Sequence, residues 1–270
     1  MNIISKKNKN KYYNFLNSLP KKINHLYFVK LKKKLKINNK SKKKEKFDPV
    51  TNIDRSIELY LRQEITKKFP SDGIIGEEFQ IKKSKSGFTW IIDPIDGTRS
   101  FIIGGPTWSN LISVSFKNTP TFGLANFPML NKYYITGKNK SSFLVKNKKF
   151  KKLKVVRSNS LKKIKIAGNF FNYLPINKQK KVSRLIKLMK YPCLDALSYC
   201  QLCEGKVDVV LQCSNKIWDI HPLISLIKNS GGYVTTWDNK NPKQGGNIVA
   251  SSSIKIHKKI LSLLKPISNY

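Results

Sequence analysis

Acidic residues are scarce in this chain: 15 Asp and Glu stand against 53 Lys and Arg among 270 residues, for a formal net charge of +38. Lysine arrays of this kind favour nucleic acid, because they neutralise phosphates and release counterions. Arginine, the residue suited to bidentate phosphate contacts, is scarce as well. No aromatic residue interrupts the basic runs "SKKNKNK" and "KSKKKEK", as a stacking platform would. We therefore expect a solvated lysine-rich surface and no dedicated nucleic-acid partner.

Cysteine and histidine are also few. The four cysteines fall within 21 positions, and only Cys200 and Cys203 have CxxC spacing, inside an apolar helical pattern. We expect inert thiols in a reducing compartment, with a metal or redox pair as the alternative. His25, His221 and His257 show no partner pattern with Ser or Cys, which argues against a nucleophilic side chain in catalysis. His221 is the one expected near an active site, and we interpret it as structural.

Long apolar runs are absent. No run reaches the roughly 18 residues needed to span a bilayer. The N-terminus "MNIISKKNKNKYYNF" lacks the apolar stretch and cleavage site of a signal peptide. Hydrophobic residues make up 40% of the chain and aromatic residues 11%, which is typical of a globular protein with a substantial core. We expect a cytoplasmic protein with no membrane partner.

The pattern along the chain changes twice. Residues 1–45 read as a lysine-rich helical segment, in which helices between residues 10 and 38 are broken near Pro20. Residues 46–150 read as an α+β half, and residues 151–270 as an α/β half that carries substrate specificity. We expect the two halves to meet at a cleft.

The α+β half begins with the helix "DPVTNIDRSIELYLRQEITKKF", whose apolar face runs through Ile57, Leu61 and Ile65. The strands "TWII", "TWSNLISVSF", "TFGLANF" and "KYYITG" follow, and we interpret the last three as an antiparallel sheet. In the α/β half, "IKIAGN", "VDVVLQC", "GYVTTW" and "NIVAS" read as strands. The segments "NKQKKVSRLIKLMK", "LDALSYCQLCEG" and "WDIHPLISLIKNSGG" read as the helices between them.

The few acids concentrate in one stretch, "IIDPIDGTRSF". Asp93 and Asp96 lie on either side of Pro94, and Gly97 follows, which allows close backbone approach. We expect a buried strand to stop at Asp93, so that Asp96 faces the same point. The next residues predict one or two helical turns, whose first N–H groups would form an anion cradle. Paired carboxylates beside bound phosphate are the coordination that Mg²⁺ prefers.

Two further acidic spots can complete such a site: Glu77 and Glu78 in "GEEF", and Asp219 in "WDIHP". Each acid has a simpler interpretation when taken alone. The glutamates suit a solvated loop, Asp219 and Asp96 suit helix caps, and Asp93 suits the end of a strand. It is their combination that favours a metal site.

The ordered set of Asp54, "GEE", "DPIDGT" and "WD" resembles the magnesium-dependent, lithium-sensitive phosphatase superfamily. That group includes inositol monophosphatases, bisphosphate nucleotidases and histidinol-phosphate phosphatases. The resemblance covers about residues 45–265 and implies a layered α-β-α-β-α sugar-phosphatase fold of the α/β class. It also implies two or three Mg²⁺ ions per active site, a small phosphorylated substrate and a homodimer.

The resemblance assigns roles residue by residue. Thr98 and Glu77 would orient the attacking water, Gly97 and Thr98 would hold phosphate through their N–H groups, and Asp54 would support this network from behind. Two ions about 3.5–4 Å apart would activate the water and neutralise charge as phosphate is displaced in line. The metal ligands would be Glu77, Asp93, Asp96, Asp219 and the main-chain carbonyl of Ile95.

Three stretches resemble the histidinol-phosphate phosphatase branch: Arg99 directly after the Thr, Asp195 in "CLDALSYCQLCEG", and "GGYVTTWDN". An acid at position 195 would pair with the ammonium group of histidinol phosphate; the simpler alternative is a helix N-cap. Gln212 departs from the family pattern, because relatives commonly place a substrate-binding Glu there. The substrate-binding set would be Ile95, Asp96, Gly97, Thr98, Arg99, Asp195 and Asp219.

The sequence therefore predicts a Mg²⁺-dependent phosphoric monoester hydrolase, most similar to the histidinol-phosphate phosphatases of histidine biosynthesis. An inositol monophosphatase or a 3′-phosphate nucleotidase of the same superfamily is the nearest alternative. The alternative from another class is a basic RNA-binding protein on a phosphatase fold. Four converging acids argue against it, since a binding module has no need of them.

Overall fold

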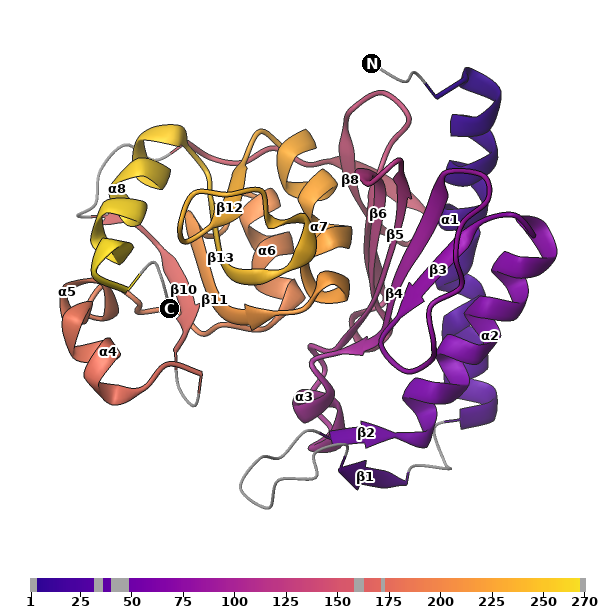
Figure 1. Ribbon diagram of the computed structural model, residues 1–270, viewed down its shortest axis with the longest axis horizontal. Coiled ribbons are helices and arrows are strands. Elements are labelled where there is room, and N and C mark those ends of the chain that lie inside the picture. The colour runs from indigo at the N-terminus through magenta and orange to yellow at the C-terminus, as the bar shows by residue number, and fades with distance from the viewer. Residues whose placement is uncertain (1–3, 32–35, 40–48, 158–162, 171–172, 268–270) are drawn as a thin grey trace.

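The computed structural model describes residues 4–31, 36–39, 49–157, 163–170 and 173–267 (Figure 1). Residues 32–35 of the expected N-terminal helical region and the whole basic run at 40–46 lie outside the described residues. The end of that region, which was expected to be helical to residue 38, is a strand at Ile37–Asn39. The described chain forms five layers that alternate between helices and sheets, and they follow one another from right to left in Figure 1. The layered α-β-α-β-α architecture is therefore confirmed.

The first layer begins with helix α1 (Lys6–His25), which continues through Pro20. The prediction of a break near Pro20 was wrong. A proline inside a helix costs about 3 kcal/mol, but Leu16, Leu19 and Ile23 are fully buried on the same helix. Burial of each such side chain contributes about 1.5–3 kcal/mol, so the packing outweighs the lost hydrogen bond.

Helix α2 (Asn52–Lys68) completes this layer and confirms the second predicted helix. It begins at Thr51, whose hydroxyl accepts hydrogen bonds from the N–H groups of Ile53 and Asp54. A π-helical segment, η1 (Leu26–Leu31), extends α1. Both helices share one hydrophobic core with one face of the first sheet. The residues that α2 contributes to that core include Ile57, Leu61 and Ile65.

The second layer is a seven-stranded sheet with the strand order β3-β4-β5-β6-β7-β8-β9. Its neighbouring strands are antiparallel, except for the parallel pair β3 and β4. The predicted strands are confirmed as β4 to β7, whereas β3, β8 and β9 were not predicted. The strands are β3 (Gly73–Gly76), β4 (Phe88–Asp96), β5 (Ser109–Phe116), β6 (Thr119–Phe127), β7 (Lys132–Thr136), β8 (Ser142–Lys146) and β9 (Lys149–Lys152).

The third layer consists of helices α6 (Ala196–Cys203) and α7 (Ile217–Asn229), which lie between the two sheets (Figure 1). Their apolar residues share a second core with the other face of the seven-stranded sheet. Helix α7 carries Asp219 in its first turn, and it contacts β4, β5 and β6. A residue from the second half of the chain is thereby brought to the acidic strand of the first half.

The fourth layer is a four-stranded sheet with the order β10-β11-β13-β12, in which only β10 and β11 are parallel. All four strands coincide with predicted ones. Their outer face packs on the third core, beneath the last layer of helices. The strands are β10 (Ile166–Asn169), β11 (Val209–Asn215), β12 (Tyr233–Thr236) and β13 (Gly246–Ser251).

The fifth layer contains α4 (Ile176–Lys181), α5 (Ser183–Ile186) and α8 (Ile254–Leu264). The helix predicted over "NKQKKVSRLIKLMK" is two short helices, because Val182 leaves the helical region with φ −119° and ψ 24°. Its side chain is buried in the third core instead. Among the described residues, no helix is both long enough and apolar enough to cross a bilayer.

The remaining elements are short. The ribbon of β1 (Ile37–Asn39) and β2 (Pro49–Thr51) leads into α2, and α3 (Thr98–Ile102) follows the acidic strand β4 as predicted. Three 3₁₀ segments complete the described chain. They are η3 (Pro128–Leu130), η5 (Pro242–Gln244) and η6 (Lys265–Ile267).

Candidate active site

A bulge in strand β4 brings its two acids to one face. Residues three apart on a regular strand point to opposite faces of the sheet. Here Asp93 and Asp96 pair with residues of β5 that are only two positions apart, so Pro94 and Ile95 together stand opposite Asn110. The prediction that the strand stops at Asp93 was wrong: it continues to Asp96. Because β4 has one more residue than β5 between these pairs, the carboxylate of Asp96 lies on the same face of the sheet as that of Asp93.

Asp93, Asp96 and Asp219 converge. Each offers a carboxylate oxygen, and these atoms all lie within 4.8 Å of one another. Asp219 also accepts a hydrogen bond at Oδ2 from the N–H of Lys216 (2.7 Å), so the helix-cap interpretation of Asp219 holds together with its place in the cluster. Among the described residues, nothing donates a hydrogen bond to the buried Oδ1 of Asp93.

Burial and mutual repulsion make this cluster a poor place for free negative charge. Burial raises the pKa of Asp93 well above its usual value, and the charges of Glu77, Asp96 and Asp219 raise it further. Burial likewise raises the pKa of Asp96, and it raises the pKa of Asp219 to about 7. A divalent cation would relieve the repulsion and would satisfy the orphaned oxygen of Asp93. The donor set, which consists of hard carboxylate oxygens, fits Mg²⁺.

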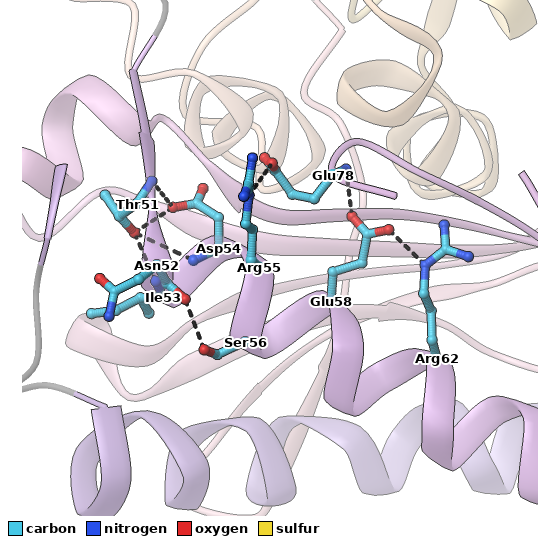
Figure 2. Close-up of polar contacts among 9 residues, drawn as sticks. All are labelled: Thr51, Asn52, Ile53, Asp54, Arg55, Ser56, Glu58, Arg62 and Glu78. Carbon is cyan, nitrogen blue, oxygen red and sulfur yellow. Dashed lines mark hydrogen bonds and ion pairs between the residues drawn. The ribbon is translucent and has the colours of Figure 1, made fainter. Parts of the chain in front are cut away.

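Asp54 lies behind the cluster in the first turn of α2. Its Oδ2 accepts hydrogen bonds from the backbone N–H of Thr51 (2.9 Å) and from the Thr51 hydroxyl (Figure 2). Burial raises the pKa of Asp54 to about 6, against the opposing effect of those hydrogen bonds, and the charge of Glu77 raises it further. Glu77 also raises the pKa of Asp93 and Asp219. Its carboxylate is therefore within electrostatic reach of Asp54, Asp93 and Asp219.

The loop that carries Glu77 is held by a residue that the sequence analysis missed. Glu58 is fully buried and accepts hydrogen bonds from Nε of Arg62 and from the N–H of Glu78, both at 2.8 Å (Figure 2). A Cβ on Gly76 would lie 2.0 Å from Oε1 of Glu58, so only glycine fits there. The i,i+4 spacing of Glu58 and Arg62 is typical of an ion pair on a helix, and it is the feature of the sequence that could have identified Glu58.

The turn after β4, at Gly97 and Thr98, is the one that the sequence predicts to hold phosphate, and we call it the phosphate loop after that prediction. Gly97 has φ 78° and ψ 40°, a left-handed conformation that glycine adopts without strain. The hydroxyl of Thr98 donates a hydrogen bond to the carbonyl of Ile95 (2.9 Å). Since this bond uses the hydroxyl proton, the lone pairs of Oγ1 are left to accept a hydrogen from a water or substrate.

Asp195 lies against this loop. It occupies the N-cap position of α6, but its side chain makes no capping hydrogen bond, which contradicts the helix-cap alternative. A Cβ on Gly97 would lie 2.9 Å from Oδ2 of Asp195. The backbone of Asp195 is strained, with φ 47° and ψ −133°, and the next N–H, that of Ala196, donates to Oδ2 of Asp96 (3.0 Å). Strain and contacts together point the Asp195 carboxylate at the phosphate loop.

Arg99 and Tyr173 lie beside Asp195. Burial raises the pKa of Asp195, and the guanidinium of Arg99 opposes that shift. Nη1 of Arg99 donates a weak hydrogen bond to the hydroxyl of Tyr173 (3.4 Å), and the guanidinium lies 5.9 Å from the centre of its ring. Burial raises the pKa of Tyr173, the charge of Arg99 opposes that shift, and the charges of Asp195 and Asp219 add to it. Tyr173 was not predicted, because "NYLPIN" carries no motif.

Of the other residues named above, His221 and Gln212 have hydrogen-bond partners within the fold. Cys200 and Cys203 are buried on α6, and burial raises the pKa of Cys203 to about 12, as expected of inert thiols. His221 is buried and shares a hydrogen bond with the hydroxyl of Ser113 (2.8 Å). Burial lowers the pKa of His221 to about 4, so it is neutral. Gln212 donates to Sγ of Cys193 (3.4 Å).

Comparisons with known proteins agree with this geometry. The chain matches the inositol monophosphatase family model over residues 8–268. It is 30% identical to a histidinol-phosphatase of Mycobacterium tuberculosis over 223 residues, which cover 80% of this chain and 84% of that protein. It is 32% identical to a histidinol-phosphatase of Chlorobaculum parvum over 187 residues, which cover 68% and 71%.

A solved IMPase/NADP phosphatase, complexed with Mg²⁺ and phosphate, shares the fold with a TM-score of 0.81. The two chains are 19% identical, and the match covers 95% of this chain and 96% of that one. The family model and the shared fold extend over nearly the whole chain, and the two relatives cover 80% and 68% of it. This protein belongs to the inositol monophosphatase family of phosphatases.

Proposed function

We propose that this protein is a Mg²⁺-dependent phosphomonoesterase that hydrolyses histidinol phosphate. The observation that carries the choice of substrate is the Asp195 carboxylate, which lies beside the phosphate loop and caps no helix. A phosphate held at Gly97 and Thr98 would have this acid next to its alcohol group. The alcohol of histidinol phosphate carries an ammonium group, and an acid at this place complements it. Two relatives named histidinol-phosphatase, at 30% and 32% identity, support the same choice.

The metal ligands would be the carboxylates of Glu77, Asp93, Asp96 and Asp219 and the carbonyl of Ile95. The two or three Mg²⁺ ions held there would lower the pKa of a coordinated water and neutralise charge on the phosphate. The convergence of three of these acids within 4.8 Å and the orphaned oxygen of Asp93 support the assignment. No side chain needs to act as a nucleophile.

The chain's own residues would orient the reactants. Thr98 donates to the carbonyl of Ile95, so its oxygen can accept a hydrogen from the attacking water and aim that water at phosphorus. Glu77 would accept the other hydrogen of the water. The backbone N–H groups of Gly97 and Thr98 would hold the phosphate oxygens. Asp54 would support Glu77 and Asp93 from behind, in the position that its bonds to Thr51 impose.

Arg99 would influence substrate specificity through its interaction with Asp195. Its guanidinium lies close enough to Asp195 to lower the pKa of that carboxyl, and it is braced by Tyr173. The substrate ammonium would therefore share Asp195 with Arg99, which weakens the attraction that Asp195 offers.

A substrate panel tests this proposal. Phosphate release is measured from histidinol phosphate, inositol 1-phosphate, adenosine 3′-phosphate and glycerol phosphate, with Mg²⁺ and then with added Li⁺. We expect the highest kcat/KM on histidinol phosphate, a requirement for Mg²⁺, and inhibition by Li⁺. A clear preference for inositol 1-phosphate or adenosine 3′-phosphate would contradict the proposed substrate but would still support Mg²⁺-dependent phosphomonoester hydrolysis. Tight, salt-dependent RNA binding with no turnover on any substrate would instead favour a binding protein.

We also propose a cytoplasmic homodimer, in which residues 46–150 supply most of the metal and phosphate ligands and residues 151–270 supply specificity. Light scattering after gel filtration tests the dimer, and a monomeric mass would contradict it.

A further inference from the structure

Three asparagines form a hydrogen-bonded chain from the first helix to the acidic bulge. Nδ2 of Asn126, on β6, donates to Oδ1 of Asn24 on α1 and to Oδ1 of Asn110 on β5, both at 2.8 Å. Nδ2 of Asn110 then donates to the carbonyl of Pro94 at 2.6 Å. Asn110 and Asn126 are fully buried, so water does not compete for these bonds. The chain ends on the residue between Asp93 and Ile95.

The direction of every bond in this chain is determined by its last acceptor. The carbonyl of Pro94 can only accept, so Asn110 must present its NH₂ group to it and turn its oxygen towards Asn126. Asn126 must then present its own NH₂ group, whose second hydrogen reaches the oxygen of Asn24. One arrangement of the three amides satisfies all the bonds, so the chain is a defined structure and not a set of interchangeable polar contacts.

The point of attachment is the bulge itself. Asn110 is the single residue of β5 that stands opposite both Pro94 and Ile95. Pro94 has no N–H group to offer the ladder, so its carbonyl is the backbone group through which a neighbour can hold it. The bulge in turn determines whether Asp93 and Asp96 face the same side of the sheet. A contact that holds the bulge therefore holds the spacing of the two carboxylates.

We infer that Asn110, oriented by Asn126 and Asn24, is a positioning residue for the metal site. It preorganises the bulge so that Asp93 and Asp96 can bind the same ions, and it couples the N-terminal helix to that site. The inference rests on the metal-dependent function proposed above. Residues that hold metal ligands in position without touching the ion typically change metal affinity by about 10- to 100-fold.

A merely structural role for this chain of amides makes a different prediction. Loss of a buried hydrogen bond anywhere in the sheet lowers stability, but it leaves the affinity for a metal ion unchanged in the protein that remains folded. The test therefore needs metal binding measured directly, without turnover, together with variants that lose comparable bonds elsewhere.

The chain offers two matched controls. Asn17 lies on the same helix as Asn24 and accepts a hydrogen bond from the hydroxyl of Tyr133 (3.0 Å), in the same sheet but away from the bulge. Thr136 is fully buried on β7 and accepts from the N–H of Gly123 (2.8 Å). Asn17→Ala removes one such bond. Thr136→Val removes the bond from Gly123 and a long one (3.5 Å) from the Thr136 hydroxyl to the carbonyl of Gly123. Neither variant changes an asparagine of the chain.

Mn²⁺ serves as the probe, and the electron paramagnetic resonance signal of the free ion reports its binding to the purified full-length protein. We expect Asn110→Ala to raise the Kd for Mn²⁺ by about 10- to 100-fold. Asn24→Ala, which removes only the far end of the chain, should raise it by a smaller factor. Asn17→Ala and Thr136→Val should leave the Kd within about twofold of the wild type, even where they lower Tm as much as Asn110→Ala.

The outcomes separate the two proposals. An unchanged Kd in Asn110→Ala, or equal losses in the control variants, would overturn the positioning role while the metal-dependent phosphatase stands. If the wild type binds Mn²⁺ and Asn110→Ala weakens that binding, but the wild type hydrolyses no phosphomonoester, the proposed function is refuted and the positioning role of Asn110 stands. If Asn110→Ala does not fold, the comparison of Asn24→Ala with Asn17→Ala decides, because both changes are on the half-buried face of α1. A wild type that binds no Mn²⁺ would overturn both.

Discussion

Replacement of Asp195 by asparagine separates the proposed function from its nearest rivals. The substitution Asp195→Asn keeps the size of the side chain, and asparagine tolerates a positive φ better than most residues, so the strained backbone at φ 47° is retained. Only the charge beside the phosphate loop is lost. Because the Asp195 side chain caps no helix, the cost of about 1 kcal/mol for a lost N-cap should not appear in the stability of the variant.

The expected effect on specificity follows from the contact that is removed. A hydrogen bond between charged groups contributes about 1.5–3 kcal/mol. Each 1.4 kcal/mol is a factor of about ten, so kcat/KM for histidinol phosphate should fall by about 10- to 150-fold. Arg99 already neutralises part of the charge of Asp195, which favours the lower end of that range. Glycerol phosphate, whose alcohol is uncharged, should be hydrolysed as before.

Steady-state phosphate release on both substrates, at saturating Mg²⁺, provides the measurement. The Mg²⁺ concentration for half-maximal activity should not rise, because the charge of Asp195 raises the pKa of Asp96, and its removal makes this proposed ligand easier to ionise. Equal losses of kcat/KM on the two substrates, together with a lower Tm, would show that Asp195 stabilises the fold and does not determine substrate specificity.

Three further predictions concern the metal site. Asp93→Asn should leave the fold intact and abolish Mg²⁺-dependent hydrolysis, because it removes charge from the centre of the cluster; near-normal turnover at saturating Mg²⁺ would contradict the ligand assignment. Thr98→Ala should lower kcat more than it raises KM, since its oxygen would aim the attacking water, and a pure effect on KM would make Thr98 a phosphate holder. The third prediction uses the carboxyl of Asp219, whose pKa of about 7 lies above the unfolded value. Its contribution to stability is present below about pH 4 and is lost as pH rises towards 7, so Mg²⁺ should raise Tm more at about pH 7.5 than at about pH 5; equal shifts in differential scanning fluorimetry would refute this.

The sequence determined those features whose cause is local. The strands β4 to β7 and β10 to β13 were readable from short apolar runs bounded by turn residues. Helix α2 was readable from the spacing of Ile57, Leu61 and Ile65, and the family from the order of its acidic motifs. These patterns need no knowledge of what packs against them, because periodicity and turn chemistry are properties of neighbouring residues.

Tertiary structure decided what depends on partners that are distant in the sequence. Pro20 looks like a helix breaker, but the core beneath α1 outweighs the missing hydrogen bond. Glu58 looks like a surface residue of α2, but the loop of Glu78 closes over it. Asp195 looks like a helix cap, but a strained backbone turns its side chain to the phosphate loop.

The acidic turn shows both contributions in one place. The sequence supplies two carboxylates three residues apart and a proline that cannot join the ladder, and this identifies the stretch as a candidate metal site. A spacing of three would put the carboxylates on opposite faces of a regular strand. They face the same side only because β5 pairs with β4 across a bulge, where Asn110 holds the carbonyl of Pro94. Register between strands is a property of two segments at once, so neither segment's sequence could determine it alone.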